Sequence, residues 1–427
     1  MLVKSRKKAV KIVRDLPNYP KAEEAVIAEP IFLPPEEVAA QENAEEPNRP
    51  IPQPPKKASW WKRTPKKKKL LILVPCAVVV LLLISLALYL LVFKKDKPVV
   101  VSVKMVAVVQ KAPPPIPTTI ASKLTGLQIT PELNKRGVTA IMIENSIDAR
   151  PQSGLLEAGV IYEAIAEGGI TRFVALFQES QPDSIGPVRS ARPYFIDWML
   201  PYNAIYGHIG GSNVALQMIS DLGIRDFGES AGGNTFNRLS TRFSPHNAYT
   251  NMAGIDALRA SKNWENSDFT GMPRKAESPA KTLTAETIDI KLSSLYFNVR
   301  YDYDTASNSY RRSEGGTAHK DDKSGAQLSP KVVVALVVPY SIDPDGIHSD
   351  YATVGTGQAF VFQDGIYQEA TWTKSAQSAQ IELKDAGGRV LALNPGQTWF
   401  TAVGGSNMVT FTAPTPVVPA PTVKVGP

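Results

Sequence analysis

Residues 138–144 read VTAIMIE, residues 171–177 read TRFVALF and residues 204–208 read AIYGH. Each run is short and apolar, as the buried strands of a sheet are. Loops rich in glycine, arginine, histidine or glutamate follow these runs. Polar groups in the loops after strands commonly form the site of an α/β domain. These runs therefore indicate both the fold of the region and the place of its functional groups.

The segments between these runs have the spacing of helices. Apolar residues recur at intervals of three and four in residues 155–167, 194–200 and 213–222. Ser212 is placed to cap the last of these helices. Strands that alternate with helices favour a mainly parallel sheet with flanking helices. We therefore expect an α/β N-terminal domain over residues 123–275.

The chain changes character near residue 288. Strand-like runs follow one another there without helical segments between them, and Asp364-Gly365 is typical of a hairpin turn. We therefore expect a β-rich C-terminal domain over residues 276–408. Residues 409–427 contain five prolines and predict a disordered tail.

The N-terminal part predicts a membrane anchor. Residues 1–69 are rich in lysine, glutamate and proline, which predicts a disordered, basic, cytoplasmic tail. Residues 70–93 carry no charge and are long enough, at about 1.5 Å per residue, for a single transmembrane helix. Lysines are more numerous before this segment than after it, which predicts a cytoplasmic N-terminus. Residues 94–122 would then form a Pro-containing linker to an extracytoplasmic body.

Charge and cysteine content exclude several classes of protein. Sixteen of the 47 Lys and Arg residues precede residue 70, against nine of the 40 Asp and Glu residues, so the remainder is close to neutral. A nucleic-acid partner is not expected, because no basic stripe lies on the globular part. Cys76 is the single cysteine and lies in the apolar segment. Disulfides, thiolate catalysis and cysteine-based metal sites are therefore excluded from the globular part, and we expect no metal and no cofactor.

Several longer motifs occur in order along the chain. They are Glu144-Asn145 followed by Ala149-Arg150-Pro151-Gln152-Ser153-Gly154, Glu167-Gly168-Gly169-Ile170-Thr171-Arg172-Phe173, Gly186-Pro187-Val188-Arg189-Ser190-Ala191-Arg192, Pro245-His246-Asn247 and Asn394-Pro395-Gly396-Gln397-Thr398-Trp399. With these motifs the chain resembles the DUF3048 family of bacterial envelope proteins over residues 122–405. The resemblance implies an α/β N-terminal domain, a β-rich C-terminal domain and tethering to the outer side of a membrane. It supplies no reaction.

An acidic pair is the first candidate for chemistry. Glu163 and Glu167 share one face of the predicted helix over residues 155–167, where their like charges repel each other. A neighbouring cation is therefore expected, and Arg172, Arg189 and Arg192 are the candidates. One interpretation is a structural network of carboxylates and guanidiniums. The others are a metal site or a pair of general acids.

Arginines and glycines supply the candidates for ligand binding. Arg189 and Arg192 precede a predicted helix and suit a phosphate or carboxylate, although they would serve equally to hold the acidic pair. Arg150 and Arg172 lie in the family motifs and are further candidates. Gly210-Gly211-Ser212 connects a strand to a helix, so its free backbone N–H groups suit an anion. Close packing is the alternative reason for the two glycines.

Two of the four histidines are candidates for catalysis. His208 and His246 lie in loops of the predicted α/β domain, and either suits a general base or a metal ligand. Packed, hydrogen-bonded histidines are the alternative. Asn247 follows His246 and offers directional hydrogen bonds. His319 and His348 lie in polar stretches of the β-rich half, where we expect solvated side chains.

The leading hypothesis is an extracytoplasmic envelope protein that binds an anionic or cell-wall ligand, or that serves as a scaffold. Its partners would be a membrane, crossed once, and a cell-wall polymer or another envelope protein. The alternative is an extracytoplasmic hydrolase of phosphodiester or glycan bonds, with His208 or His246 as the base and Glu163 or Glu167 as an acid or metal ligand. A third reading makes the β-rich half a docking module that pairs through a strand edge.

Overall fold

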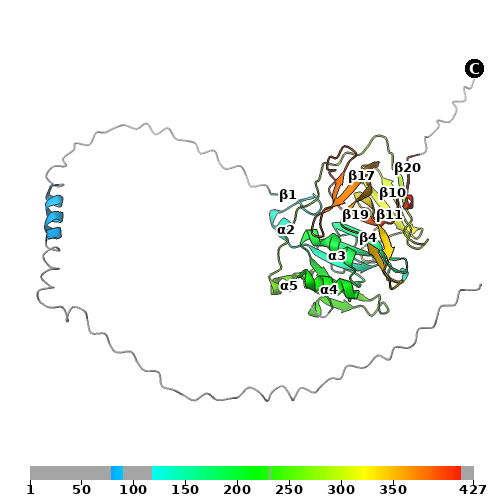
Figure 1. Ribbon diagram of the computed structural model, residues 1–427, viewed down its shortest axis with the longest axis horizontal. Coiled ribbons are helices and arrows are strands. Elements are labelled where there is room, and N and C mark those ends of the chain that lie inside the picture. The colour runs from blue at the N-terminus through cyan, green and yellow to red at the C-terminus, as the bar shows by residue number, and fades with distance from the viewer. Residues whose placement is uncertain (1–77, 90–117, 230–231, 415–427) are drawn as a thin grey trace, which may run out of the picture. The chain divides into compact units, whose positions relative to one another are not determined.

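The computed structural model describes residues 78–89, 118–229 and 232–414 (Figure 1). By its contacts the chain divides into two units, Met1–Gln110 and Lys111–Pro427. In the first unit, the described residues 78–89 form a helix. The second unit is the folded body, and it contains every strand of the described residues. The predicted tail over residues 1–69 lies outside the described residues.

The prediction of a transmembrane helix over residues 70–93 is wrong. Within the described part of the chain, no helix is both long enough and apolar enough to cross a membrane. The other residues of the predicted span, 70–77 and 90–93, lie outside the described residues.

A nine-stranded sheet forms the centre of the folded body. From one edge to the other its strands are β18 (Glu382–Lys384), β17 (Ile366–Lys374), β16 (Gly355–Gln363), β13 (Val332–Val337), β19 (Thr398–Val403), β4 (Val160–Glu167), β5 (Ile170–Phe177), β3 (Thr139–Glu144) and β6 (Ile205–Gly207). Among these described strands, three neighbouring pairs are parallel, namely β13–β19, β19–β4 and β3–β6, and the other five are antiparallel. The sheet is mixed, so the prediction of a mainly parallel sheet is wrong.

A hairpin explains much of this difference. β4 and β5 are joined by Gly168 and Gly169, which both have positive φ angles of 54° and 79°. Two consecutive residues of this kind make the tight turn that connects antiparallel strands, and glycine adopts it without steric strain. The sequence pattern instead predicts a helix over residues 155–167. Apolar residues four apart fit one face of a helix, but they also fit one face of a strand, because four is a multiple of two.

The central sheet is covered on both faces, and the described helices are few. One face packs on α3 (Pro193–Met199) and α4 (Asn213–Asp221) through a core that includes Tyr162, Trp198 and Phe400. The other face packs on α5 (Met252–Lys262) and on a second, five-stranded sheet. That sheet has the order β12 (Thr317–Ala318), β11 (Ser309–Glu314), β10 (Val299–Asp304), β9 (Thr287–Ile290) and β20 (Val409–Thr412). Figure 1 shows α3, α4 and α5 at one end of the body and β10, β11 and β17 at the other.

The remaining elements are short. They include the strand pairs β1 (Ile120–Ala121) with β2 (Gln128–Ile129), β7 (Phe236–Arg238) with β8 (Ala248–Thr250), and β14 (Tyr340–Ile342) with β15 (Ser349–Tyr351), together with helix α2 (Pro131–Lys135).

The two predicted halves of the chain share the central sheet. β19 comes late in the sequence, yet it lies between β13 of the β-rich half and β4 of the N-terminal half, parallel to both. Its residues are buried throughout. β20, which begins the segment predicted as a tail, pairs with β9. Residues 415–427 of that segment lie outside the described residues.

Candidate functional site

The last residue of β3 and the residue after it bring side chains to opposite faces of the central sheet. Side chains alternate along a strand, and Met142 and Ile143 of β3 already belong to the cores on opposite faces. Glu144 and Asn145 continue this alternation and reach two different polar groups. Glu144 lies beside His246, and Asn145 donates a hydrogen bond to Glu314 in the second sheet.

Glu144 is the centre of the first group, which we call the Glu144 cluster and which consists of Glu144, Ser146, Arg189 and His246. The Glu144 carboxylate is buried. It accepts a hydrogen bond from the Ser146 hydroxyl at 2.9 Å, and both its oxygens lie 3.0 Å from His246 Nδ1. Arg189 Nε lies 3.3 Å from Glu144 Oε1. A buried carboxylate thus holds one histidine and one arginine side by side.

These contacts determine which nitrogen of His246 carries the proton. A carboxylate can only accept, so Nδ1 is the protonated nitrogen that faces Glu144. Nε2 has no hydrogen-bond partner among the described residues, and the side chain is 21% exposed. A histidine that a carboxylate orients in this way presents Nε2 to solvent as a base or as a hydrogen-bonding group.

Arg189 differs from the other arginines predicted to bind a ligand. Its side chain is 24% exposed, against 3% for Arg172 and 5% for Arg192. Apart from the contact of Nε with Glu144, no partner of its guanidinium lies among the described residues. Both Nη groups of Arg189 therefore keep their donors for a ligand.

Arg172 and Arg192 both form ion pairs with Glu167. Each donates an Nη2 hydrogen bond to that carboxylate, while their Nη1 groups donate to the carbonyls of Ser190 and Ala191. Burial opposes ionisation of Glu167, but the two guanidiniums outweigh it and lower the pKa of this carboxyl. Burial, together with the charge of Arg192, lowers the pKa of Arg172 to about 10. Around Glu167 the geometry is therefore that of a structural network of carboxylate and guanidinium groups, which is one of the interpretations given above for the acidic pair.

The glycine loop lies beside Arg189. The Ile209 N–H donates to the Arg189 carbonyl at 3.1 Å, and the Ala191 N–H donates to the Gly210 carbonyl at 3.0 Å. The N–H groups of Gly210 and Gly211 have no acceptor among the described residues. Ser212 accepts a hydrogen bond from the Ala215 N–H and so caps α4. Asn247 accepts one from Arg238.

The four residues predicted as catalytic do not come together. Glu163 pairs with Arg312, Glu167 with Arg172 and Arg192, and His246 with Glu144. His208 is buried, with Nε2 2.9 Å from Asp226 and Nδ1 2.6 Å from the Gly210 carbonyl. A bulge in β4 between Ile165 and Glu167 changes which face later residues occupy. It places Glu163 and Glu167 on opposite faces of the sheet.

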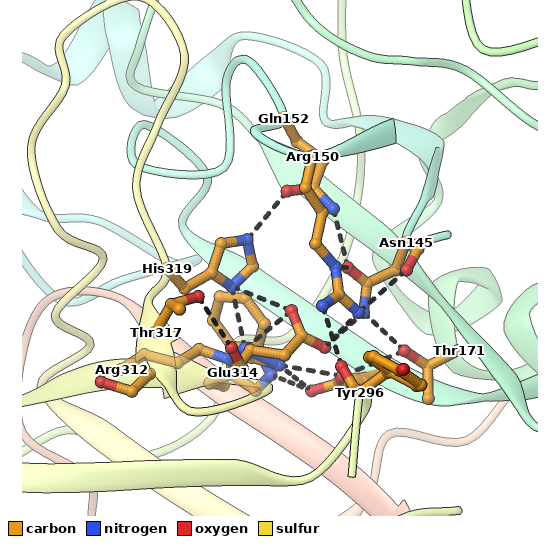
Figure 2. A network of polar contacts seen from close by, with 12 residues as sticks. Asn145, Arg150, Gln152, Thr171, Tyr296, Arg312, Glu314, Thr317 and His319 are labelled. Atoms are coloured by element: carbon orange, nitrogen blue, oxygen red, sulfur yellow. Dashed lines mark hydrogen bonds and ion pairs between the residues drawn. The ribbon is translucent and has the colours of Figure 1, made fainter. Parts of the chain in front are cut away.

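The second polar group lies between the two sheets (Figure 2). Of its members, Glu163 and Arg150 are candidates predicted from the sequence, whereas Arg312, Glu314 and the buried His319 are not. Arg312, on β11, is fully buried and donates to both oxygens of Glu163 at 2.9 and 2.8 Å. Trp399 donates its indole N–H to Glu163 at 3.0 Å, and its ring lies 4.4 Å from the Arg312 guanidinium. The sequence feature that could have indicated this group is the spacing of Tyr310, Arg312 and Glu314, which places all three on one face of a strand.

Glu314 and His319 complete this group, together with Arg150. The Glu314 Oε1 atom accepts from Asn145 at 2.6 Å and lies 3.2 Å from Arg150, whereas its buried Oε2 has no hydrogen-bond partner among the described residues. Burial raises the pKa of Glu314 to about 7, with Arg312 opposing the shift and Glu163 adding to it. Arg150 also donates to the Tyr296 carbonyl at 2.8 Å and to the Asn145 carbonyl at 3.1 Å.

His319 is buried and not solvated as the sequence suggested. Its Nδ1 lies 2.8 Å from Arg312 Nη1, which can only donate, and its Nε2 lies 2.8 Å from Gln152 Oε1, which can only accept. His319 is therefore the neutral tautomer with the proton on Nε2. Burial, followed by the charges of Arg312 and Arg150, keeps its pKa well below the ordinary value.

A cavity of ≈ 290 Å³ opens beside this group. We call it the Glu314 cavity, and its lining residues are Arg150, Pro151, Glu314, Thr317, Ala318, His319 and Lys320. Arg150 and Pro151 come from the loop after β3, and the others come from β11, β12 and the residues that follow. Both halves of the chain therefore form its wall.

Comparison with known proteins gives consistent matches. A family model described as "Protein of unknown function (DUF3048) N-terminal domain" matches residues 124–265, and the corresponding C-terminal model matches residues 288–400. "Putative lipoprotein YerB" of Bacillus subtilis (strain 168) is 31% identical over 300 residues, covering 66% of this chain and 86% of that protein. The crystal structure of the YerB protein from Bacillus subtilis has a TM-score of 0.63 and 28% identity, covering 69% of this chain and 99% of that chain.

Proposed function

We propose that this chain, which belongs to the DUF3048 family, is an extracytoplasmic protein of the cell envelope that binds an anionic ligand at the Glu144 cluster. The location is supported by the name of its relative YerB, which describes a lipoprotein. The binding role is supported by one observation above all. Neither Nη group of Arg189 has a partner in the described part of the chain, and the guanidinium lies beside a histidine that a buried carboxylate orients.

The charges around Arg189 favour an anion. Arg172 and Arg192 share the carboxylate of Glu167, and Arg189 shares Glu144 with His246. The three guanidiniums thus face two carboxylates, which leaves an excess of positive charge near the most exposed of the three arginines. The free N–H groups of Gly210 and Gly211 lie next to it along the chain segment that pairs with residues 189–191. Backbone N–H groups and an arginine together suit a phosphate or carboxylate group.

The ligand class that fits is a phosphate- or carboxylate-bearing polymer of the cell wall, held at one charged group. A partly exposed cluster can bind one group of a long chain without enclosing it. Calorimetry of the purified full-length chain with phosphate-bearing wall fragments tests this. We expect Arg189→Gln to weaken binding by about tenfold or more, since a charge-assisted hydrogen bond contributes about 1.5–3 kcal/mol.

Arg238→Gln provides the matched control. Arg238 is also exposed and ends β7, before the loop that leads to His246, but it pairs with Glu229 and Asn247. Its replacement should leave the affinity within about twofold of the wild type. Equal losses in the two variants, or no loss in Arg189→Gln, would refute the assignment of the site.

Hydrolysis of phosphodiester or glycan bonds is the second candidate function, and the orientation of His246 by Glu144 favours it. In this proposal Nε2 of His246 removes a proton from the attacking water, and Arg189 stabilises the negative charge that develops. Glu163, Glu167 and His208 take no part, because each is held by different partners within the protein. Within the described residues, no three His, Cys, Asp or Glu side chains are grouped to hold a metal ion.

An assay with a chromogenic phosphodiester and with wall glycan tests the second candidate. Glu144→Gln should lower kcat by at least about 100-fold, because the amide no longer fixes the protonated Nδ1 of His246. Binding of wall fragments should change far less. If the wild type and His246→Gln turn over both substrates at the same rate, the hydrolase proposal is refuted and the binding proposal is unaffected.

A further inference from the structure

Exposed apolar side chains lie beside the Glu144 cluster. Phe243 is 91% exposed and begins the turn that ends at His246, whose N–H donates to the Phe243 carbonyl at 2.9 Å. Ile147 is 53% exposed and directly follows Ser146, whose hydroxyl lies 3.3 Å from His246 Nδ1. Apolar side chains grouped beside a polar site are typical of a surface that a ligand covers.

The segment that carries Phe243 is anchored to the segment that carries Ile147. Arg242 donates from Nη1 to the Ala149 carbonyl at 3.0 Å and from Nη2 to the Pro151 carbonyl at 2.6 Å. These bonds join the residue before Phe243 to the residues that follow Ile147. A surface that is held in place before binding loses less conformational entropy when a ligand covers it. The two apolar side chains therefore extend from backbone that is already fixed.

The hydrogen-bonding groups of the cluster require two different groups on the ligand. The Nη groups of Arg189 are donors without a partner in the described part of the chain, so they suit an anion. With Nδ1 protonated toward Glu144, Nε2 of the neutral His246 ring can only accept a hydrogen bond. A fully ionised phosphate or carboxylate has no proton to donate to Nε2. The ligand therefore has to carry a hydroxyl group as well as an anionic group.

We propose that the ligand of the Glu144 cluster is an acidic sugar, whose phosphate or carboxylate pairs with Arg189, whose hydroxyl donates to Nε2 of His246 and whose ring lies on Phe243. This inference rests on the proposed function and names the chemical class of its ligand. A pyranose ring carries hydroxyl groups around its edge and C–H groups on its faces. The slightly positive C–H groups are attracted to the negative face of an aromatic ring, and Ile147 adds apolar surface beside it. An acidic sugar thus matches the donors, the acceptor and the apolar side chains together.

NMR titration of the full-length chain with small probes tests the ligand class. Glucose 1-phosphate and glucuronate are the acidic sugars, glycerol 3-phosphate is a phosphate with hydroxyl groups but no ring, and glucose is a ring with no charge. We expect at least one acidic sugar to bind about fivefold or more tightly than glycerol 3-phosphate and than glucose. The two acidic sugars distinguish a phosphate from a carboxylate as the charged group.

Phe243→Ala should weaken binding of the acidic sugar by about fivefold or more, but should leave the affinity for glycerol 3-phosphate within about twofold. Phe243→Tyr keeps an aromatic ring and should retain the affinity of the wild type. Tyr296→Ala is the matched control, because Tyr296 is also an exposed aromatic residue, but its carbonyl lies beside Arg150 in the second polar group. It should leave both affinities unchanged. Phe243 is exposed, so its replacement should not impair folding.

The proposal is overturned if glycerol 3-phosphate binds as tightly as both acidic sugars, or if Phe243→Ala and Tyr296→Ala behave alike. It is also overturned if Phe243→Ala abolishes binding to phosphatidylcholine vesicles and leaves sugar binding intact, since the ring would then contact a membrane. In each of these cases Arg189→Gln would still weaken binding of the phosphate probes, so the proposed function would stand. If no anionic probe binds in a way that depends on Arg189, the proposed function fails and this inference fails with it.

Discussion

Arg312 and Glu163 form an ion pair that is closed to solvent on both sides. Both side chains have no exposed surface, and the guanidinium lies among the rings of Trp399, Phe173 and Tyr301. Removing two charges from water costs several kcal/mol each, and their attraction offsets this only when the remaining hydrogen bonds are made. Here Trp399 and Thr171 donate to Glu163 as well. Because Glu163 lies on the central sheet and Arg312 on the second sheet, we infer that the pair sets the relative position of the two sheets.

Replacing Arg312 alone should be severely destabilising. Arg312→Met leaves the Glu163 carboxylate buried without its cation, so the free energy of unfolding should fall by about 3–5 kcal/mol. The double variant Arg312→Met with Glu163→Gln should recover part of that loss, since no uncompensated charge remains. Urea denaturation of the three proteins measures both effects. A loss below about 1 kcal/mol in the single variant would contradict this view of the pair.

Glu314 should make stability depend on pH in a defined direction. Its pKa is raised from an ordinary 4.5 to about 7 in the folded protein, so the folded state binds the proton more tightly than the unfolded state does. The contribution of this group to stability is complete below pH 4.5 and is lost as the pH rises through about 7. The stability of Glu314→Gln relative to the wild type should therefore increase across this interval. A constant difference would show that Glu314 titrates alike in both states.

Among the single elements, β4 shows why the fold predicted from the sequence differs from the observed fold. Its residues are buried on both faces, so no polar residue marks a solvent side, and the interval of four is compatible with a helix and with a strand. Gly168-Gly169 was the better signal, because it predicts a hairpin. The bulge near Glu167 follows from tertiary packing, and no local sequence pattern predicts it. The separation of Glu163 from Glu167 therefore could not be predicted.

The candidate site was predictable in part. Arg189, His246 and the glycine loop were singled out because they follow strands, and the structure places them around Glu144 or next to Arg189. The partners of Arg172 and Arg192 depend on which face Glu167 occupies. The Arg312–Glu314–His319 group lies on a hairpin far along the chain. Its contact with Asn145 and Arg150 depends on the packing of one sheet on another, which the sequence pattern does not encode.

Variants at the N-terminal cap of helix α4 can distinguish a structural role of the glycine loop from a role in ligand binding. The Ser212 hydroxyl accepts a hydrogen bond from Ala215 N–H, so Ser212→Ala should lower the free energy of unfolding by about 1 kcal/mol. Asn251→Ala, at the equivalent cap of α5, should cause a similar loss. Neither variant should change the affinity for wall fragments by more than about twofold. A tenfold loss of affinity in Ser212→Ala alone would give its hydroxyl a place in the ligand site.

At the scale of the whole molecule, β19 joins the two halves of the folded body. It pairs with β4 through residues 398–401 and with β13 through residues 398–403. Without it, β4 would expose a row of unpaired N–H and C=O groups in the middle of the sheet. The Glu314 cavity likewise takes its wall from both halves. The central sheet and the Glu314 cavity therefore both require that the two halves of the chain assemble.

Separating the halves should prevent folding of the first. A fragment of residues 118–286 retains β4 but lacks β19, so we expect poorly dispersed NMR spectra and no cooperative thermal transition. Co-expression with residues 287–414 should restore both, because β19 then returns to its place. A sharp, cooperative transition of residues 118–286 alone would show that the N-terminal half is stable without β19.

Arg189 and the oriented His246 are proposed to bind the anionic ligand together, and the imidazole nitrogens of His246 report directly on that binding. The measurement is the ¹⁵N chemical shift of these nitrogens in the full-length chain during titration with a phosphate-bearing wall fragment. We predict a spectrum of the Nδ1-protonated tautomer, whose Nε2 accepts a hydrogen bond from a hydroxyl group of the ligand. Nε2 should show a saturable shift in the wild type and in Arg238→Gln but not in Arg189→Gln. An unchanged Nε2 signal in the wild type, or the same shift in Arg189→Gln, would contradict binding of the ligand by this pair of residues.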